Sequence, residues 1–167
     1  MRVIPSWRDR DGTAFDIATD GSLTNRNTWA KFGEPTSERD IATVTAMMNV
    51  AADGCTLDAE GALWFADFGG GRVVRVQNGR IVDEIQTSTG VFACALGGSD
   101  GRTLFLCTAP DFDPQVREVE HAAELLAVRV DVRLPEVPGR PSRPNGHVIS
   151  VGGQRIRLKF RSPLCHV

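Results

Sequence analysis

The sequence has no apolar stretch that could span a bilayer, which would take roughly 20 consecutive apolar residues. It also lacks a signal-peptide pattern, because the N-terminal segment MRVIPSWRDRDG becomes charged within eight residues. Its 167 residues, 41% of them hydrophobic, are enough for one domain with a real core. We therefore expect a cytoplasmic protein that does not engage a membrane.

Cys-x-x-Cys spacing is missing as well, which argues against a zinc or redox motif. Three of the four cysteines lie inside apolar, strand-like runs, and buried cysteines usually behave as small apolar side chains. We expect buried free thiols rather than disulfides or metal ligands at these positions. They are Cys55, Cys94, Cys107 and Cys165.

Acidic residues are absent from residues 138–167, although this segment carries six Lys or Arg. The last four basic residues alternate with apolar ones, which predicts an amphipathic strand and argues against nucleic-acid binding. Proline and glycine are frequent just before it, as in a linker. The expected organisation is an irregular lead-in at 1–12, a folded domain at 13–134, and a Pro- and Arg-rich tail at 135–167 with one hairpin at 148–160.

Four short apolar runs follow one another between glycine-containing turns in residues 51–86. Each run is too short for a helix, so the pattern predicts one antiparallel four-stranded sheet. The runs are Cys55–Leu57, Leu63–Ala66, Val73–Val76 and Ile81–Ile85. The Asp53-Gly54 pair before them is interpreted as a turn, since Asp-Gly favours the positive φ of tight turns.

Two other segments share this strand-and-turn pattern. A hairpin is expected at residues 13–32, and residues 91–108 repeat the first half of the four-stranded unit about 40 residues later, an offset typical of β-propeller blades. A third strand of that repeat is expected at 125–132. Helical patterns within 33–50 and 116–126 predict short connections. The predicted fold is all-β: a partial β-propeller of roughly two to three four-stranded blades with one or two short helices.

The segment around Asp53 resembles a known family. The run Ala52-Asp53-Gly54, followed by residues 57–64 and 72–76, is similar to the P-D-G…D-x-E-G-x-L-W…G-R-V-x-R segment of the regucalcin (senescence marker protein), gluconolactonase and luciferin-regenerating-enzyme family. The hairpin before this segment and the repeat after it also resemble their counterparts there. The resemblance covers residues 13–133.

This resemblance implies a six-bladed propeller that hydrolyses sugar lactones or related esters. It implies one divalent cation at the mouth of the central channel, with Ca²⁺ favoured over Zn²⁺, Mn²⁺ and Mg²⁺. Such an ion is held by oxygen ligands, acidifies a water and polarises the lactone carbonyl. In the family the acid of the P-D-G turn is a metal ligand and the candidate general base, and its match here is Asp53.

The sequence departs from the family pattern near this site. Ala52 stands where the family has proline, and the family's glutamate and asparagine ligands belong to segments without a counterpart here. Asn25 and Asn27 lie in a different hairpin and receive no ligand role. One carboxylate falls short of the roughly six oxygens that a hard cation takes. We therefore expect a C-terminal portion of a lactonase with an incomplete site, or alternatively a non-catalytic propeller segment that acts as an interaction module.

Other suggestive features are interpreted structurally. Asp58 and Glu60 could form a carboxylate pair, but we interpret them as a solvated hairpin tip at the outer rim of a blade. Gly69-Gly70-Gly71 lacks the Lys-Ser/Thr of a phosphate loop and is interpreted as a tight connection. So few blades leave sheet edges exposed, which predicts self-association, including a ring of two or three copies.

Overall fold

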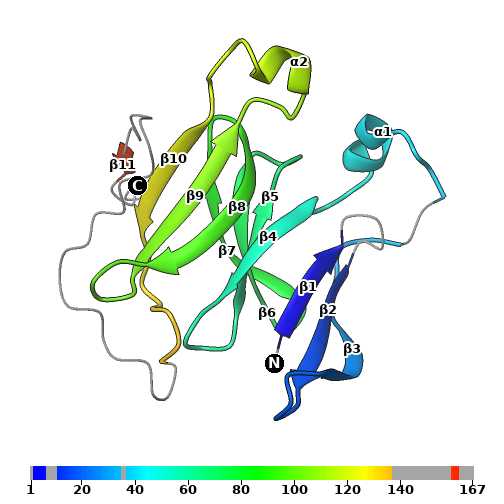
Figure 1. Cartoon of the computed structure of the whole chain (residues 1–167), viewed down its shortest axis with the longest axis vertical. Helices are drawn as coiled ribbons and strands as arrows, with labels where there is room; N and C mark the ends of the chain where they lie inside the picture. The colour runs from blue at the N-terminus through cyan, green and yellow to red at the C-terminus, as the bar shows by residue number, and fades with distance from the viewer. Residues whose placement is uncertain (1, 7–10, 35–36, 137–158, 162–167) are drawn as a thin grey trace.

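The computed structural model describes residues 2–6, 11–34, 37–136 and 159–161 (Figure 1). The strands of this part are β1 (Arg2–Ser6), β2 (Asp11–Ile17), β3 (Leu23–Lys31), β4 (Ala52–Leu57), β5 (Leu63–Asp67), β6 (Arg72–Gln77), β7 (Arg80–Gln86), β8 (Gly90–Gly97), β9 (Thr103–Ala109), β10 (Glu124–Arg129) and β11 (Lys159–Arg161). The helices are α1 (Ile41–Ala46) and α2 (Pro114–Arg117).

These strands form three sheets that follow one another along the chain. Their orders are β1-β2-β3, β4-β5-β6-β7 and β11-β10-β9-β8, here called the first, central and last sheets. Neighbouring strands are antiparallel except for β11, which pairs parallel to β10. Figure 1 shows the sheets arranged side by side like consecutive propeller blades.

The first sheet contains the predicted hairpin. Its turn has Gly21 at a φ of 85°, and the Asp20 carboxylate accepts a hydrogen bond from the Ser22 amide at 2.9 Å. The expected irregular lead-in is wrong for residues 2–6, which form β1 and pair with β2. Pro5 did not prevent this, because β1 lies at the end of the sheet, where a missing N–H is tolerated.

The central sheet is the predicted four-stranded unit. Its β6–β7 turn has Asn78 and Gly79 at φ values of 51° and 74°, the two positive values that a tight hairpin turn requires. The Gly69–Gly71 segment makes the tight β5–β6 connection, as predicted.

The last sheet is the predicted repeat, with β8, β9 and β10 in the places of β4, β5 and β6. The helix expected at 116–126 is wrong for most of its length, since α2 ends at Arg117. Asp113 caps a single turn by accepting bonds from the Gln115 and Val116 amides, and the chain then enters β10. Pairing with β9 buries Leu126, the last residue of this pattern, together with the following Ala127 and Val128. Most of the hairpin expected at 148–160 lies outside the described residues.

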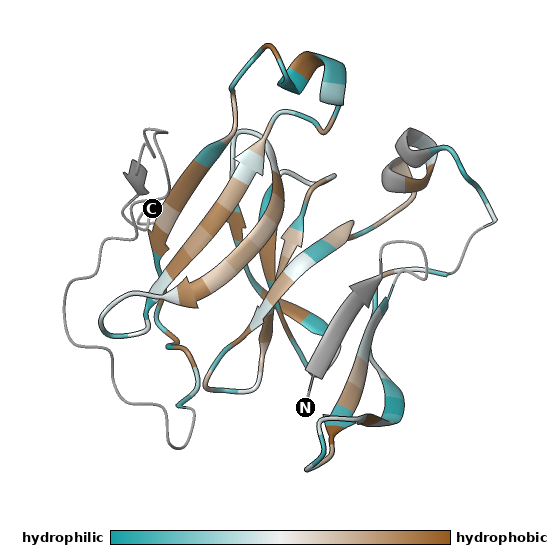
Figure 2. Ribbon diagram, in the orientation of Figure 1, coloured by the Kyte–Doolittle hydropathy of each residue, from teal (hydrophilic) through white to brown (hydrophobic). Residues whose placement is uncertain are grey.

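Two apolar cores join the sheets. One lies between the first and central sheets and includes Phe32, Phe65 and Val74, with Trp29 against it. The other lies between the central and last sheets and includes Trp64, Val73, Leu104 and Leu106. Figure 2 shows the apolar colouring along β8, β9 and β10. The central sheet is therefore covered on both faces, as an internal blade of a propeller is.

Each cysteine is buried or exposed according to the face of the sheet on which its side chain lies. Cys94 is buried and Cys55 is half-buried, but Cys107 is exposed, so the expectation of burial is wrong there. Its neighbours Leu106 and Thr108 point into the core, which leaves Cys107 on the outer face of the last sheet. None of these three cysteines, which are the ones in the described part, is in a disulfide. No helix within the described ranges is long and apolar enough to cross a membrane.

Candidate functional site

Asp53 lies inside β4 rather than in the predicted turn. Ala52 pairs with Asp67 and Cys55 pairs with Phe65, so Asp53 and Gly54 together oppose Ala66. This arrangement is a β-bulge, which bends a strand and changes the direction of a side chain. Bulges are frequent beside functional sites. This one lies on β4, the end strand of the central sheet that contacts β1 and β8 and is here called its inner strand.

Gly54 is needed because the inner strands of two blades approach each other at this point. A Cβ atom at this position would lie 3.0 Å from the Cα of Ala93 and 3.3 Å from the carbonyl oxygen of Phe92. The Cys94 thiol of β8 donates to the Gly54 carbonyl of β4 at 3.7 Å, across the same contact between the two strands. Close backbone approach, and not a positive φ, is what requires glycine here. The position of Asp53 is thus tied to the packing of β4 against β8.

The Asp53 carboxylate is exposed, and it has no hydrogen-bond or ion-pair partner among the residues that the structure describes. Partial burial nevertheless raises its pKa above the ordinary 3.8, because desolvation disfavours the charged form. A carboxylate with unused oxygens and a raised pKa can accept a proton from a water molecule or bind a cation. These are the two roles that the sequence predicts for it.

A complete cation site does not surround Asp53. Nowhere in the described part do three or more His, Cys, Asp or Glu side chains come together in a way that could hold a metal ion. Asn25 and Asn27 lie in β3, where Asn25 Nδ2 donates to Asp16 at 3.0 Å. The residues present therefore supply one carboxylate ligand and do not by themselves fit a divalent cation.

Asp58 is buried, so the interpretation as a solvated hairpin tip is wrong for it. Its carboxylate accepts a hydrogen bond from Arg75 Nε at 2.7 Å and bonds from the Glu60 and Ala62 amides at 3.0 Å. Arg75 also bonds the exposed Glu60 carboxylate at 2.8 Å. The group links the β4–β5 turn to β6. Arg75 in the G-R-V-x-R segment was the signal that could have revealed it.

Asp67 is a second buried carboxylate that the sequence did not single out. It accepts bonds of 2.9 Å each from the amides of Ala51 and Gly70 and from Arg72 Nε. Ala51 directly precedes β4, so Asp67 fixes the entry of the strand that carries Asp53. Its place before the glycine-rich connection was the available clue.

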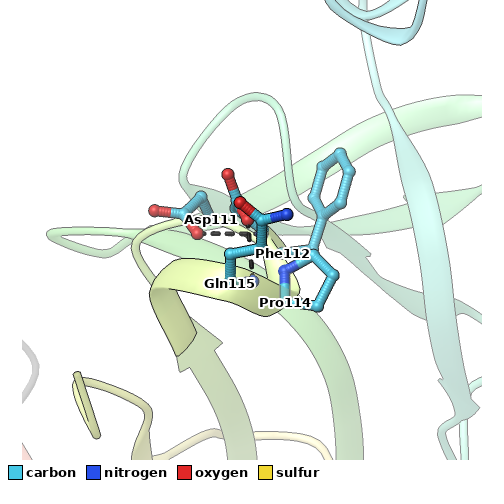
Figure 3. Close-up of a pocket in the computed structure, with 5 residues that line it drawn as sticks. Asp111, Phe112, Pro114 and Gln115 are labelled. Carbon is cyan, nitrogen blue, oxygen red and sulfur yellow. Dashed lines mark hydrogen bonds between the residues drawn. The ribbon is translucent and has the colours of Figure 1, made fainter. Parts of the chain in front are cut away.

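The connection from β9 to α2 borders an open cavity of about 510 Å³, lined by residues 111–115. Figure 3 shows the Phe112 ring projecting away from the turn of α2, with Asp111 and Gln115 on the other side. The Phe112 ring also contacts Phe68 and Phe92, at centroid distances of 6.2 and 6.4 Å. Phe68 and Phe92 of this cluster lie on segments that approach the Asp53 bulge: the Phe68 amide donates to the Ala51 carbonyl at 3.3 Å, and the Phe92 carbonyl oxygen faces Gly54.

A protein-family model described as SMP-30/Gluconolactonase/LRE-like region matches residues 7–110 of the chain. The chain is 36% identical over 84 residues to a putative sugar lactone lactonase, YvrE, of Bacillus subtilis (strain 168), covering 47% of this chain and 29% of that protein. It is 34% identical over 98 residues to regucalcin of Danio rerio, covering 57% of this chain and 28% of that protein. The chain thus spans less than a third of the length of these two relatives.

Among solved structures, the fold is similar to regucalcin of Agrobacterium tumefaciens, which is described as a calcium-binding protein. The TM-score is 0.56 and the sequence identity 16%, with 79% of this chain and 42% of that chain covered. This likeness confirms the predicted fold class, a partial β-propeller.

Proposed function

The chain belongs to the SMP-30/gluconolactonase/LRE-like family, and from this premise we propose that it serves lactone hydrolysis, with Asp53 as the general base. The observation that carries the proposal is the Asp53 bulge. The bulge carries the exposed Asp53 carboxylate on the inner strand of the central sheet, and this carboxylate has no hydrogen-bond or ion-pair partner among the described residues. In addition, the family match covers residues 7–110, which include Asp53 and the whole of the central sheet.

The proposed chemistry needs one proton acceptor at the carbonyl. The oxygen of a water molecule adds to the lactone carbonyl carbon while the Asp53 carboxylate takes a proton from that water. The ring C–O bond then breaks, and the leaving alkoxide takes that proton back from the Asp53 carboxyl group, which gives the hydroxy acid and restores the carboxylate. A raised pKa makes Asp53 a better base than an ordinary aspartate, because proton transfer from water is less uphill.

Asp53 is also the residue that we propose as a ligand of a divalent cation, with Ca²⁺ as the first candidate because it prefers carboxylate oxygens. The other ligands would have to come from outside the described residues, since these do not complete a site. Calorimetric titration with Ca²⁺ tests this part separately. Binding that is lost in Asp53→Asn supports it, and equal binding by both proteins contradicts it.

The hydrolysis proposal is tested with initial rates on glucono-δ-lactone, measured with Ca²⁺, Mn²⁺ or Zn²⁺ and with a chelator. Asp53→Asn should abolish turnover above the spontaneous rate. The matched control is Asp83→Asn, which changes an exposed carboxylate on β7 of the same sheet and should leave the rate unchanged. A folded wild-type chain without turnover, or an active Asp53→Asn variant, would contradict the proposal.

A second candidate is a non-catalytic interaction module, favoured by the single carboxylate at the site and by exposed apolar residues on β7, the outer edge strand. Ile81 and Val82 are both exposed there. Unpaired edges of this kind can add a strand from another chain. This candidate predicts a light-scattering mass that rises with concentration and a return to monomer in Val82→Lys. A mass of 18.1 kDa at every concentration contradicts it.

A further inference from the structure

Two buried carboxylates hold the central sheet in the same way, one at each end of β4. Asp58 directly follows the strand, and Asp67 lies opposite its first residue, Ala52. The two side chains are 0% and 1% exposed, and each accepts hydrogen bonds from two backbone amides and from the Nε of an arginine. The Asp58 carboxylate fixes the β4–β5 turn. The Asp67 carboxylate acts at the other end of the strand, beside the Asp53 bulge.

Asp67 holds the chain that leads into the bulge. Its Oδ1 atom accepts from the Ala51 amide at 2.9 Å, and the Ala51 carbonyl accepts from the Phe68 amide at 3.3 Å, so both polar groups of Ala51 are bound. Arg72 Nε donates to Asp67 Oδ2 at 2.9 Å, and Arg72 Nη2 donates to the Asn49 carbonyl at 2.7 Å. Hydrogen bonds of ionised groups are roughly twice as strong as those between neutral groups. The chain before β4 is therefore fixed at residues 49 and 51.

The β5–β6 connection leaves room for this carboxylate at Gly70. A Cβ atom on Gly70 would overlap Asp67 Oδ2 and would lie 2.8 Å from Asp67 Cγ and 3.1 Å from Arg72 Nε. Gly70 has no positive φ, so the space that the carboxylate occupies is what requires glycine here. The Gly70 amide also donates to Asp67 Oδ1 at 2.9 Å. A larger residue at Gly70 would displace the Asp67 carboxylate without removing its charge.

The last sheet holds the bulge from the other side. Gly54 packs against the backbone of Ala93, and its carbonyl accepts from the Cys94 thiol at 3.7 Å. Asp53 therefore lies between a segment fixed by Asp67 and a residue fixed by β8. Groups that act on a substrate must be held within about 0.5 Å of their productive position, and the residues behind them supply this precision.

We propose that Asp67 is the positioning residue of this site: it fixes the chain before the bulge and so determines where the Asp53 carboxylate lies. The inference rests on the proposed hydrolysis at Asp53. Asp67 acts through the backbone, because its two oxygens already accept three donors and its side chain is 1% exposed. A displacement of about 1 Å in a reacting group can lower the rate roughly 10²-fold.

Variants of the full chain separate positioning from stability. Asp67→Ala removes the carboxylate, and Gly70→Ala displaces it. Asp67→Asn keeps an oxygen that can accept from the Ala51 and Gly70 amides. Asp58→Ala is the matched control, because it removes a carboxylate with the same kinds of donor from the other end of β4.

Each variant is measured in three ways, at a temperature at which it is folded. Urea unfolding gives the loss of stability. Backbone NMR chemical shifts of Asp53 and Gly54 report the φ and ψ angles of the bulge. Initial rates on glucono-δ-lactone with Ca²⁺ give kcat and KM.

Asp67→Ala and Gly70→Ala should change the shifts of Asp53 and Gly54 and lower kcat about ten- to a hundredfold, with little change in KM. Asp67→Asn should retain most of the wild-type rate and shifts. Asp58→Ala should lose a similar amount of stability to Asp67→Ala and yet keep the wild-type shifts and kinetics.

The inference is overturned if Asp67→Ala and Gly70→Ala leave the shifts of Asp53 and Gly54 unchanged, or if Asp58→Ala or Asp67→Asn changes them as much as Asp67→Ala does. A kcat that falls equally in Asp67→Ala and Asp58→Ala also overturns it. If Asp67→Ala does not fold, Gly70→Ala decides by the same criteria, because it retains both charges of the ion pair.

These outcomes separate the inference from the hydrolysis proposal. A wild type without Asp53-dependent turnover refutes the hydrolysis, and the chemical shifts alone then decide whether Asp67 positions Asp53. Asp53-dependent turnover that Asp67→Ala leaves intact supports the hydrolysis and refutes the inference.

Discussion

Replacing Arg75 by methionine should destabilise the fold strongly, because Arg75 neutralises a carboxylate that has no access to solvent. The Asp58 side chain is 0% exposed, and that of Arg75 is 10% exposed. Methionine keeps most of the apolar stem of Arg75 and removes only the guanidinium. Breaking a buried ion pair on one side costs roughly 3–5 kcal/mol. Asp58 retains the amide hydrogen bonds of Glu60 and Ala62, so we expect about 3 kcal/mol, at the low end of that range.

The measurement is urea unfolding followed by circular dichroism, with the free energy of unfolding compared between variants. The last sheet offers a matched control, since Arg129 on β10 pairs with Asp100 in the β8–β9 turn, but both side chains are about half exposed. Exposed pairs are worth about 0–1 kcal/mol, so Arg129→Met should have little effect.

A double mutant completes the test. Asp58→Ala together with Arg75→Met should cost clearly less than the sum of the single variants, because the second change removes the charge that the first leaves unpaired. Similar losses in Arg75→Met and Arg129→Met, or additivity in the double mutant, would refute this account of the pair.

Three further predictions concern the contact between β4 and β8, the Asp53 carboxylate and the cysteine thiols. Gly54→Ala should lower the free energy of unfolding by roughly 1–3 kcal/mol in the same urea assay, because its Cβ would meet the Ala93 backbone; a neutral substitution contradicts the close approach. The raised pKa of Asp53 means that the folded state holds its proton longer, so stability falls as pH rises from 3.8 through the raised value. Urea unfolding at a series of pH values should therefore show the stability of Asp53→Asn rising relative to that of the wild type over this interval. A stability difference that does not change with pH would contradict the raised pKa. Brief iodoacetamide treatment with peptide mapping should modify exposed Cys107 before Cys94, since burial raises the pKa of the Cys94 thiol to about 12; preferential labelling of Cys94 would disprove this.

The strands could be predicted because short apolar runs between glycine turns have few alternatives. The turn at Asp53-Gly54 could not be told from a bulge, because glycine serves both a positive φ and a close backbone approach. Only the structure shows Ala93 against Gly54 and so identifies the second reason. The same contact, between residues 39 positions apart, is what places Asp53 on an inner strand.

The other failures share a cause in long-range pairing. The pattern of residues 116–126 is helical in isolation, but β9 offers a partner strand that buries Leu126 and the residues after it. Asp58 looked solvated because hairpin tips usually are, and only the neighbouring β6 brings Arg75 to it. Local sequence shows the alternation of side chains that is typical of strands. Contacts with distant segments decide whether an individual residue is buried, ion-paired or part of a strand.

Each of the two cores carries its own fluorophore. Trp64 is almost fully buried between the central and last sheets, and its indole nitrogen has no hydrogen-bond partner in the part of the chain that the structure describes. Trp29 is half-buried between the first and central sheets, 6.0 Å from Phe65. In a Trp7→Phe background, the emission of Trp64 and Trp29 would therefore report separately on the opening of each interface. The order in which the two signals change would show which sheet detaches first, and so whether this propeller segment melts as one cooperative unit or blade by blade.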